Sequence, residues 1–259
     1  MKRNMNQRNT QQRRQHIMQL LQQQGEVSVE QLVQFFEISE VTIRKDLTAL
    51  ESNGFLLRRY GGAILMPKDI LEQDELFSQQ KLAIAKMAAE RIREHNRIIV
   101  DSGSTTAALI KQLDGKQDLV VMTNSLSVAT ELRSLENEPT LLMTGGTWDP
   151  HSESFQGKVA EQVLRSYDFD QLFIGADGID LERGTTTFNE LIGLSQVMAE
   201  VSREVIVMVE SQKIGRRMPN LELTWDQIDV LITDNQISAQ DKQFIQDLGV
   251  QLVVAEQNF

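Results

Sequence analysis

The sequence predicts an α/β chain in two parts: an N-terminal winged helix-turn-helix and a C-terminal sensor domain with a mostly parallel sheet. Two patterns predict this class. Residues 1–66 hold three short amphipathic helix patterns followed by a basic hairpin pattern. From residue 81 to residue 259, short apolar runs alternate with helical patterns, which is typical of a parallel sheet covered on both faces. The intervening segment 67–80 is polar and acidic, and we expect it to be a linker.

The composition excludes several classes of protein. Hydrophobic residues make up 41% and charged residues 24% of the 259 residues, as in an ordinary soluble protein. The sequence has no run of 18 apolar residues and no secretory signal pattern, so we expect neither membrane insertion nor export. The absence of cysteine excludes disulfides and thiolate metal sites and fits a cytoplasmic location. The three histidines are scattered, so we expect no metal and no cofactor.

Charge is distributed unevenly along the chain. The net charge is −11, but residues 1–66 contain nine Lys and Arg against six Asp and Glu, a net charge of +3. The rest of the chain therefore carries −14. A basic head on an acidic body indicates that the head meets a polyanion.

The head begins with three helices. Helical spacing of apolar residues predicts the first over Gln11–Gln24, ending at Gly25. Ser28 begins the second, with Gln31 completing a capping-box pattern. Ser39 can cap the third, SEVTIRKDLTALESNG. Only three residues separate the second and third helices, which suits a helix-turn-helix.

The third helix has the properties of a recognition helix. When Ile43 and Leu47 face inward, the polar residues near the helix start remain on the surface, where such helices meet the major groove. The guanidinium of Arg44 suits a bidentate contact to guanine, whereas Thr42 and Lys45 suit phosphates equally well. The candidate DNA contacts of this helix are Ser39, Thr42, Arg44, Lys45 and Thr48.

A basic wing is predicted next, in the segment FLLRRYGGAILM. Two short apolar-rich runs flank Gly61 and Gly62, which tolerate the positive φ of a two-residue hairpin turn. Arg58, Arg59 and Tyr60 lie on the first arm, so we expect them to contact the DNA backbone.

The body alternates strands and helices. The strands we expect are Arg97–Asp101, Leu119–Thr123, Thr140–Thr144, Gln171–Gly175, Val205–Glu210, Val230–Thr233 and Gln251–Val254. The helices we expect are Lys81–Glu94, Thr105–Leu113, Ser125–Leu135, Val159–Ser166, Leu191–Ser202 and Ala239–Asp247.

Polar residues follow five of these strands, and in an open α/β sheet the carboxyl ends of the strands form the ligand crevice. The segment DSGSTT suits a phosphate monoester, because its glycine allows close approach and its hydroxyls lie at a helix start. Amide and carboxylate groups elsewhere on this edge suit sugar hydroxyls, and Lys213 suits a phosphate or carboxylate. The candidate effector ligands are Asp101, Ser102, Gly103, Ser104, Thr105, Thr106, Asn124, Gly145, Gly146, Asp177 and Lys213. Ordinary helix capping and polar connecting loops would use the same residue types.

Two nucleotide-binding motifs are absent from the sequence. The Gly-Lys pairs at 115–116 and 157–158 lack the upstream glycine and the following Ser or Thr of a phosphate-binding P-loop. No G-x-G-x-x-G follows a strand.

These segments resemble the DeoR family of bacterial sugar-metabolism regulators over nearly the whole chain. In the head the likeness rests on VSVEQLVQFFEISEVTIRKDLTALESNGFLLRRYGGA. In the body it rests on DSGSTT, MTNS, MTGGT, FIGADGID, GTTTFNE and SQKIG. TNSL, GADGID and TTTFNE are most similar to the glucitol operon repressor branch.

The resemblance implies a C-terminal fold similar to ribose-5-phosphate isomerase and glucosamine-6-phosphate deaminase. It implies that DSGSTT holds phosphate, with Asp101, Asp177, Glu190 and Lys213 near the sugar. It further implies a repressor released from operator DNA by a phosphorylated sugar or sugar alcohol. A palindromic operator needs at least a homodimer, and a homotetramer would also fit. The chain departs from the family in the loop TWDPHSES, which has Trp148, Asp149 and His151 where basic residues are frequent, so the effector or its orientation could differ.

Two other functions remain open at this point. A sugar-phosphate isomerase-like enzyme could use Asp101, Asp177 or Glu190 as acid and base, but the head would have no role in it. A DNA-binding scaffold without an effector would leave the polar strand ends unexplained.

Overall fold

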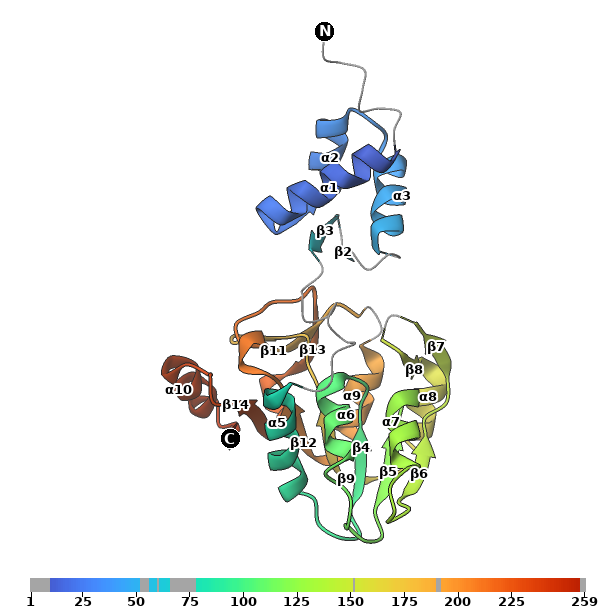
Figure 1. Ribbon diagram of the computed structural model, residues 1–259, viewed down its shortest axis with the longest axis vertical. Helices are drawn as coiled ribbons and strands as arrows, with labels where there is room; N and C mark the ends of the chain where they lie inside the picture. Colours follow the sequence, from blue (N-terminus) through green and yellow to red (C-terminus); the bar gives the residue numbers. More distant parts are fainter. Residues whose placement is uncertain are drawn as a thin grey trace. The chain divides into compact units, whose positions relative to one another are not determined.

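The computed structural model describes residues 10–51, 56–59, 61–65, 78–150, 152–189 and 192–256 (Figure 1). The chain divides into two compact units, Met1–Glu75 and Leu76–Phe259. Within the described residues, no helix combines the length and the apolar character needed to cross a membrane.

The N-terminal unit is a winged helix-turn-helix. Its elements are α1 (Thr10–Gln24), β1 (Glu26–Ser28), α2 (Val29–Phe36), α3 (Glu40–Glu51), β2 (Leu56–Arg59) and β3 (Gly62–Leu65). The predicted capping box begins α2: the Gln31 amide donates to Ser28 Oγ at 3.0 Å, and the Ser28 amide donates to Gln31 Oε1 at 2.9 Å. Buried apolar side chains from all three helices and the sheet form one core.

The wing is a three-stranded antiparallel sheet in the order β1-β3-β2. Arg59 pairs with Gly62, so the two residues between β2 and β3 are 60 and 61, and the prediction that both glycines form the turn is wrong for Gly62. Gly62 instead pairs with Ser28 of β1, and a Cβ atom there would lie 2.2 Å from the Val27 carbonyl oxygen. Glycine is therefore required at position 62 because β1 and β3 lie so close together there. The hairpin pattern in the sequence does not reveal this contact.

A buried ion pair joins α1 to α3. Asp46 is only 2% exposed, and its carboxylate accepts from Arg13 Nε at 2.5 Å and from Arg14 Nε at 3.0 Å. The Arg13 side chain is itself 5% exposed. The aspartate of the third-helix segment thus holds the helices together, while Arg44 and Lys45 just before it remain exposed.

The C-terminal unit contains a seven-stranded parallel sheet in the order β15-β14-β12-β9-β4-β5-β6. Its strands are β4 (Arg97–Val100), β5 (Val120–Thr123), β6 (Thr140–Met143), β9 (Phe169–Ile174), β12 (Ser202–Met208), β14 (Val230–Asp234) and β15 (Gln251–Ala255). All seven are strands that the alternating pattern predicts, so the parallel α/β class is confirmed.

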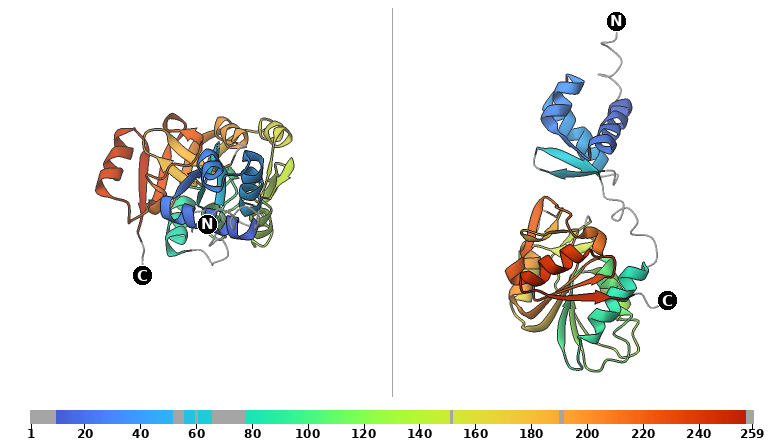
Figure 2. Two further views of the ribbon diagram at one scale, coloured as in Figure 1. Left: turned by 90° about the horizontal axis from the view of Figure 1, so that it is seen from above. Right: turned by 90° about the vertical axis from the view of Figure 1, so that its left-hand side faces the viewer.

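Helices cover both faces of this sheet (Figure 2). The helices are α5 (Gln79–Glu90), α6 (Ser104–Ile110), α7 (Leu126–Leu132), α8 (Lys158–Leu164), α9 (Gly193–Glu200) and α10 (Ala239–Asp247). One buried cluster packs α5, α6 and α7 against Ile98 and Val100 of β4. The other packs α8, α9 and α10 against Ile99, which points to the opposite face.

Two smaller β structures extend from the sheet. Strands β10 (Gly178–Asp180), β11 (Gly184–Thr187) and β13 (Asn220–Thr224) form an antiparallel sheet, and β7 (Thr147–Asp149) pairs with β8 (Ser154–Gln156). A short 3₁₀ turn, η1 (Ser211–Lys213), follows β12. None of these β structures was predicted.

Candidate functional site

The strand order changes direction between β4 and β9. From β4 the chain proceeds through β5 to β6 on one side, and from β9 through β12 and β14 to β15 on the other. The loops leaving two such neighbouring strands diverge, which opens a crevice at their carboxyl ends. The Asp101 amide donates to the Phe173 carbonyl at 3.0 Å, so the DSGSTT and GADGID segments begin side by side.

The DSGSTT segment turns directly into α6. Gly103 is exposed and has φ +131°, a backbone conformation that disfavours side chains, and it precedes the first residue of the helix. Thr105 and Thr106 are buried, and Thr106 Oγ1 donates to the Gly103 carbonyl at 2.9 Å. Ser102 and Ser104 are partly buried. The glycine backbone and the two serines therefore form the accessible part of this loop.

Asp101 and Asp177 bring two carboxylates to the crevice. Asn124, after β5, is 1% exposed and donates from Nδ2 to Asp101 Oδ1 at 2.8 Å. Burial, together with the nearby charge of Asp177, raises the pKa of Asp101 to about 6. Asp177 accepts a hydrogen bond from Thr187 Oγ1 at 2.6 Å.

Glu222 is a third carboxylate that sequence reasoning missed. It lies on β13, is 9% exposed, and accepts from Ser195 Oγ at 2.7 Å. Burial raises its pKa to about 8, and the charges of Asp101 and Asp177 add to this effect, so the three groups share one electrostatic environment. The sequence does contain one indication of this buried group, because Glu222 stands between two leucines.

Lys213 comes to the same region from the loop after β12. Its Nζ donates to the carbonyl of Ala176 at 3.0 Å, which places the ammonium beside the residue preceding Asp177. Gly145 and Gly146 follow the edge strand β6, which β5 separates from β4. Glu190 and His151 lie outside the described residues. Of the predicted effector ligands, the four that the described contacts bring together are therefore Asp101, Asn124, Asp177 and Lys213.

Replacing Glu222 with glutamine should reduce the pH dependence of stability. Because the folded-state pKa of Glu222 is raised to about 8 from an ordinary 4.5, the folded protein holds a proton that the unfolded chain releases. Its contribution to the free energy of unfolding is therefore present below pH 4.5 and declines as the pH rises toward 8. Denaturant unfolding between pH 5 and pH 8.5 should show a smaller decline for Glu222→Gln than for the wild type. An equal decline in both proteins would contradict the buried, protonated glutamate.

Three of the candidate DNA-contact residues, Arg44, Lys45 and Thr48, are exposed on α3. Arg44 is about half exposed and pairs with Glu40 at 2.6 Å, one turn earlier. Thr48 Oγ1 donates to the Arg44 carbonyl at 2.8 Å and accepts from Arg58 Nη1 at 3.0 Å, which joins the wing to α3. Lys45 is exposed.

The other candidates lie at the helix start and in the wing. Ser39 Oγ and Thr42 Oγ1 are 2.9 Å apart at the start of α3. Arg59 pairs with Glu26 of β1, and Tyr60 lies outside the described residues. Arg58 and Arg59 thus have acidic or polar partners within the unit, and DNA phosphates would have to compete with these partners.

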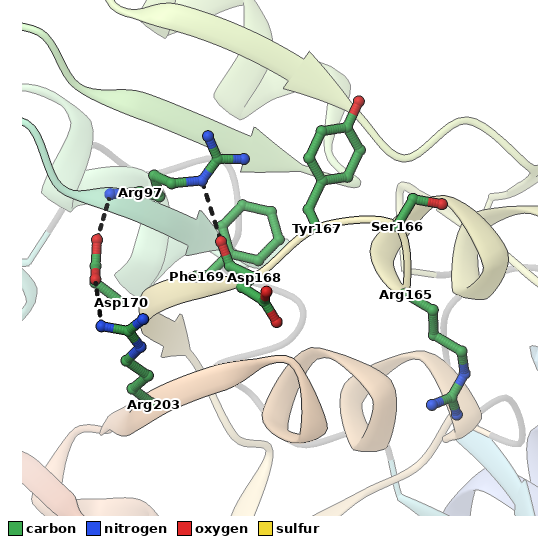
Figure 3. A pocket seen from close by; sticks show the side chains of 8 residues that line it. All are labelled: Arg97, Arg165, Ser166, Tyr167, Asp168, Phe169, Asp170 and Arg203. Carbon is green, nitrogen blue, oxygen red and sulfur yellow. Dashed lines mark hydrogen bonds and ion pairs between the residues drawn. The ribbon is translucent and has the colours of Figure 1, made fainter.

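A separate cavity of about 450 Å³ lies at the opposite, amino-terminal ends of β4, β9 and β12 (Figure 3). Arg97 lies over the rings of Tyr167 and Phe169, with its Cζ 5.8 Å from each ring centroid. The two other arginines of the lining have acidic partners: Arg165 pairs with Glu200, and Arg203 lies 3.7 Å from Asp170. We assign no ligand to this cavity, because its cations are already engaged by protein groups.

Comparisons with known proteins cover almost the whole chain. A profile described as the DeoR-like helix-turn-helix domain matches residues 13–68, and one described as the DeoR C terminal sensor domain matches residues 77–235. The putative aga operon transcriptional repressor of Escherichia coli O157:H7 is 38% identical, over 95% of this chain and 94% of its own. The regulator GolR of Listeria innocua is 32% identical, over 94% of this chain and 98% of its own.

A third relative is the lactose phosphotransferase system repressor of Lactococcus lactis, which is 31% identical over 90% of this chain and 94% of its own. Among solved structures, ribose 5-phosphate isomerase A of Methanocaldococcus jannaschii matches 54% of this chain and 55% of its own, with 19% identity and a TM-score of 0.39. A likeness at that level has no functional implication.

Proposed function

Because the chain belongs to the DeoR family of transcriptional regulators, we propose that it represses a carbohydrate-utilisation operon under the control of a phosphorylated sugar or sugar alcohol. The relatives support both parts of this role: one is named as an operon repressor and another as the repressor of a lactose phosphotransferase system. The observation that carries the sensor part is the set of polar side chains that meet where the strand order reverses between β4 and β9: Asp101, Asn124, Asp177 and Lys213.

In this proposal the crevice binds the effector through complementary groups. The DSGSTT loop receives the phosphate at the exposed Gly103 backbone, and the ammonium of Lys213, which also donates to Ala176, contacts a second anionic oxygen. The carboxylates of Asp101 and Asp177 accept hydrogen bonds from sugar hydroxyls, and the side-chain amide of Asn124 can donate or accept one. Glu190 is a further candidate from the family resemblance.

The N-terminal unit binds operator DNA in this proposal. The recognition helix α3 enters the major groove, and the wing follows the backbone. A palindromic operator needs two such units, so we propose a homodimer or homotetramer. The effector lowers operator affinity only if it binds the DNA-free arrangement of the oligomer more tightly than the DNA-bound one.

Arg44→Ala should weaken specific operator binding by about 10- to 100-fold, the usual range for losing one bidentate base contact. A fluorescence titration against the chain's own upstream region, at a stated salt concentration, measures this effect. Non-specific binding to a scrambled duplex should change much less, because Glu40 already offsets the charge of Arg44. Lys111→Ala, on the other unit, is the matched control. Equal losses on both duplexes would contradict base readout by Arg44.

An isomerase-like activity is a second candidate, because the crevice contains carboxyl groups with raised pKa values. Incubation with pentose and hexose phosphates, followed by analysis of the products, tests it. Turnover that is lost in Asp101→Ala would favour the enzyme over the sensor.

A further inference from the structure

An exposed valine lies where the recognition helix would meet bases. Val41 is 63% exposed, the most exposed of the large hydrophobic side chains among the described residues. It is the second residue of α3, in the first turn, from which recognition helices contact base edges. A single exposed valine is ordinary on a protein surface, so its position on the helix has to decide whether it has a role.

Val41 is centred on the outward face of α3. Successive residues turn about 100° around a helix, so residues 41, 45 and 48 lie close to one line along it. The buried residues Ile43, Asp46, Leu47 and Leu50 occupy the opposite side. Val41 therefore contributes nothing to the core of the unit, and its neighbours along the face are the candidate DNA contacts Lys45 and Thr48.

The chemistry of the neighbours determines which partner fits. Lys45 is an exposed cation one turn from Val41, and Arg44 lies on the same face, so this surface suits a polyanion better than an apolar protein. The valine side chain offers no hydrogen-bond donor or acceptor and can make only apolar contacts. In the major groove, the complementary apolar group is the C5 methyl of thymine.

We propose that Val41 packs against a thymine methyl in each operator half-site and so determines specificity at that base pair. This contact rests on the proposed function, since it requires operator binding through α3. It adds an apolar element of base readout to the polar contacts proposed for Arg44 and Lys45.

A cycle of paired substitutions in protein and DNA tests the contact. Each thymine of the operator half-site is replaced in turn by deoxyuridine, which removes only the methyl group. The affinity of the full-length protein for each duplex is then measured for the wild type and for Val41→Ala. Alanine favours helix at an exposed position, so loss of α3 is not expected from this substitution.

At one thymine position, deoxyuridine should weaken wild-type binding about fourfold per half-site, the effect of one buried methyl group. The same replacement should not change the affinity of Val41→Ala for the duplex. Val159→Ala, which alters an equally exposed valine on α8 (59%), should respond to deoxyuridine as the wild type does.

If each deoxyuridine weakened specific binding by the same factor in the wild type and in Val41→Ala, the contact would be overturned. It would also be overturned if no deoxyuridine weakened wild-type binding. A wild-type protein that protects no sequence in a footprint would remove the proposed function itself, and the two failures are therefore distinguishable.

Discussion

Asp46→Ala should unfold the N-terminal unit or destabilise it by about 3–5 kcal/mol, the usual cost of removing one partner from a buried ion pair. The substitution leaves the guanidinium of Arg13, whose side chain is 5% exposed, without the carboxylate that compensates its charge. Arg14 loses the same partner, and α1 loses its polar attachment to α3. Specific DNA binding should be lost as a consequence, although Asp46 itself is buried and faces away from the groove.

Hydrogen exchange of the full-length protein measures this effect locally. Peptides from α1 and α3 should lose protection in Asp46→Ala, while peptides from the parallel sheet should keep theirs. Glu30→Ala, which removes an exposed carboxylate from α2, is the matched control and should exchange almost as the wild type does. Unchanged protection of α1 and α3 in Asp46→Ala would show that the ion pair does not hold the helices together.

Lys213→Ala should strongly weaken the response to effector while leaving operator binding intact. Loss of a charge-assisted hydrogen bond, worth about 1.5–3 kcal/mol, corresponds to effector binding about 10- to 100-fold weaker. Lys213 is well separated in sequence from α3 and the wing, and it contacts Ala176 beside the crevice carboxylate Asp177. Asp101→Ala should give the same pattern, because it removes the acceptor held by Asn124.

Operator titrations with and without effector measure this response, and Lys86→Ala, an exposed lysine of α5, is the control for lysine removal. A normal response of Lys213→Ala would place the effector site elsewhere.

The parallel sheet was predictable because each of its strands is a short apolar run between turn signals. The sheet of β10, β11 and β13 was not, because β11 reads Gly-Thr-Thr-Thr and has no apolar alternation. Its threonines are nevertheless buried, through pairing with a strand that lies more than 30 residues away. Phe35 is the opposite case: it belongs to the apolar residues of α2, yet its ring is 57% exposed.

The sequence predicts the individual polar loops of the candidate site, but it does not predict which of them lie next to one another. Polar residues after β4, β5 and β9 are visible in the sequence, since each follows an apolar strand. That β4 and β9 are neighbours is a long-range property, and it alone brings Asp101 and Asp177 together. Glu222 reaches the same region from β13, whose place depends on the unpredicted antiparallel sheet.

In the proposed function, a sugar phosphate bound at the crevice controls operator affinity. The most direct test is an operator titration repeated with a panel of hexose, hexitol and pentose phosphates, for the wild type and for Lys213→Ala. We expect one compound to weaken wild-type binding about 5- to 150-fold, the usual range of allosteric coupling, and to affect Lys213→Ala much less at the same concentration. Specific operator binding that no compound alters, or that changes equally in both proteins, would contradict it.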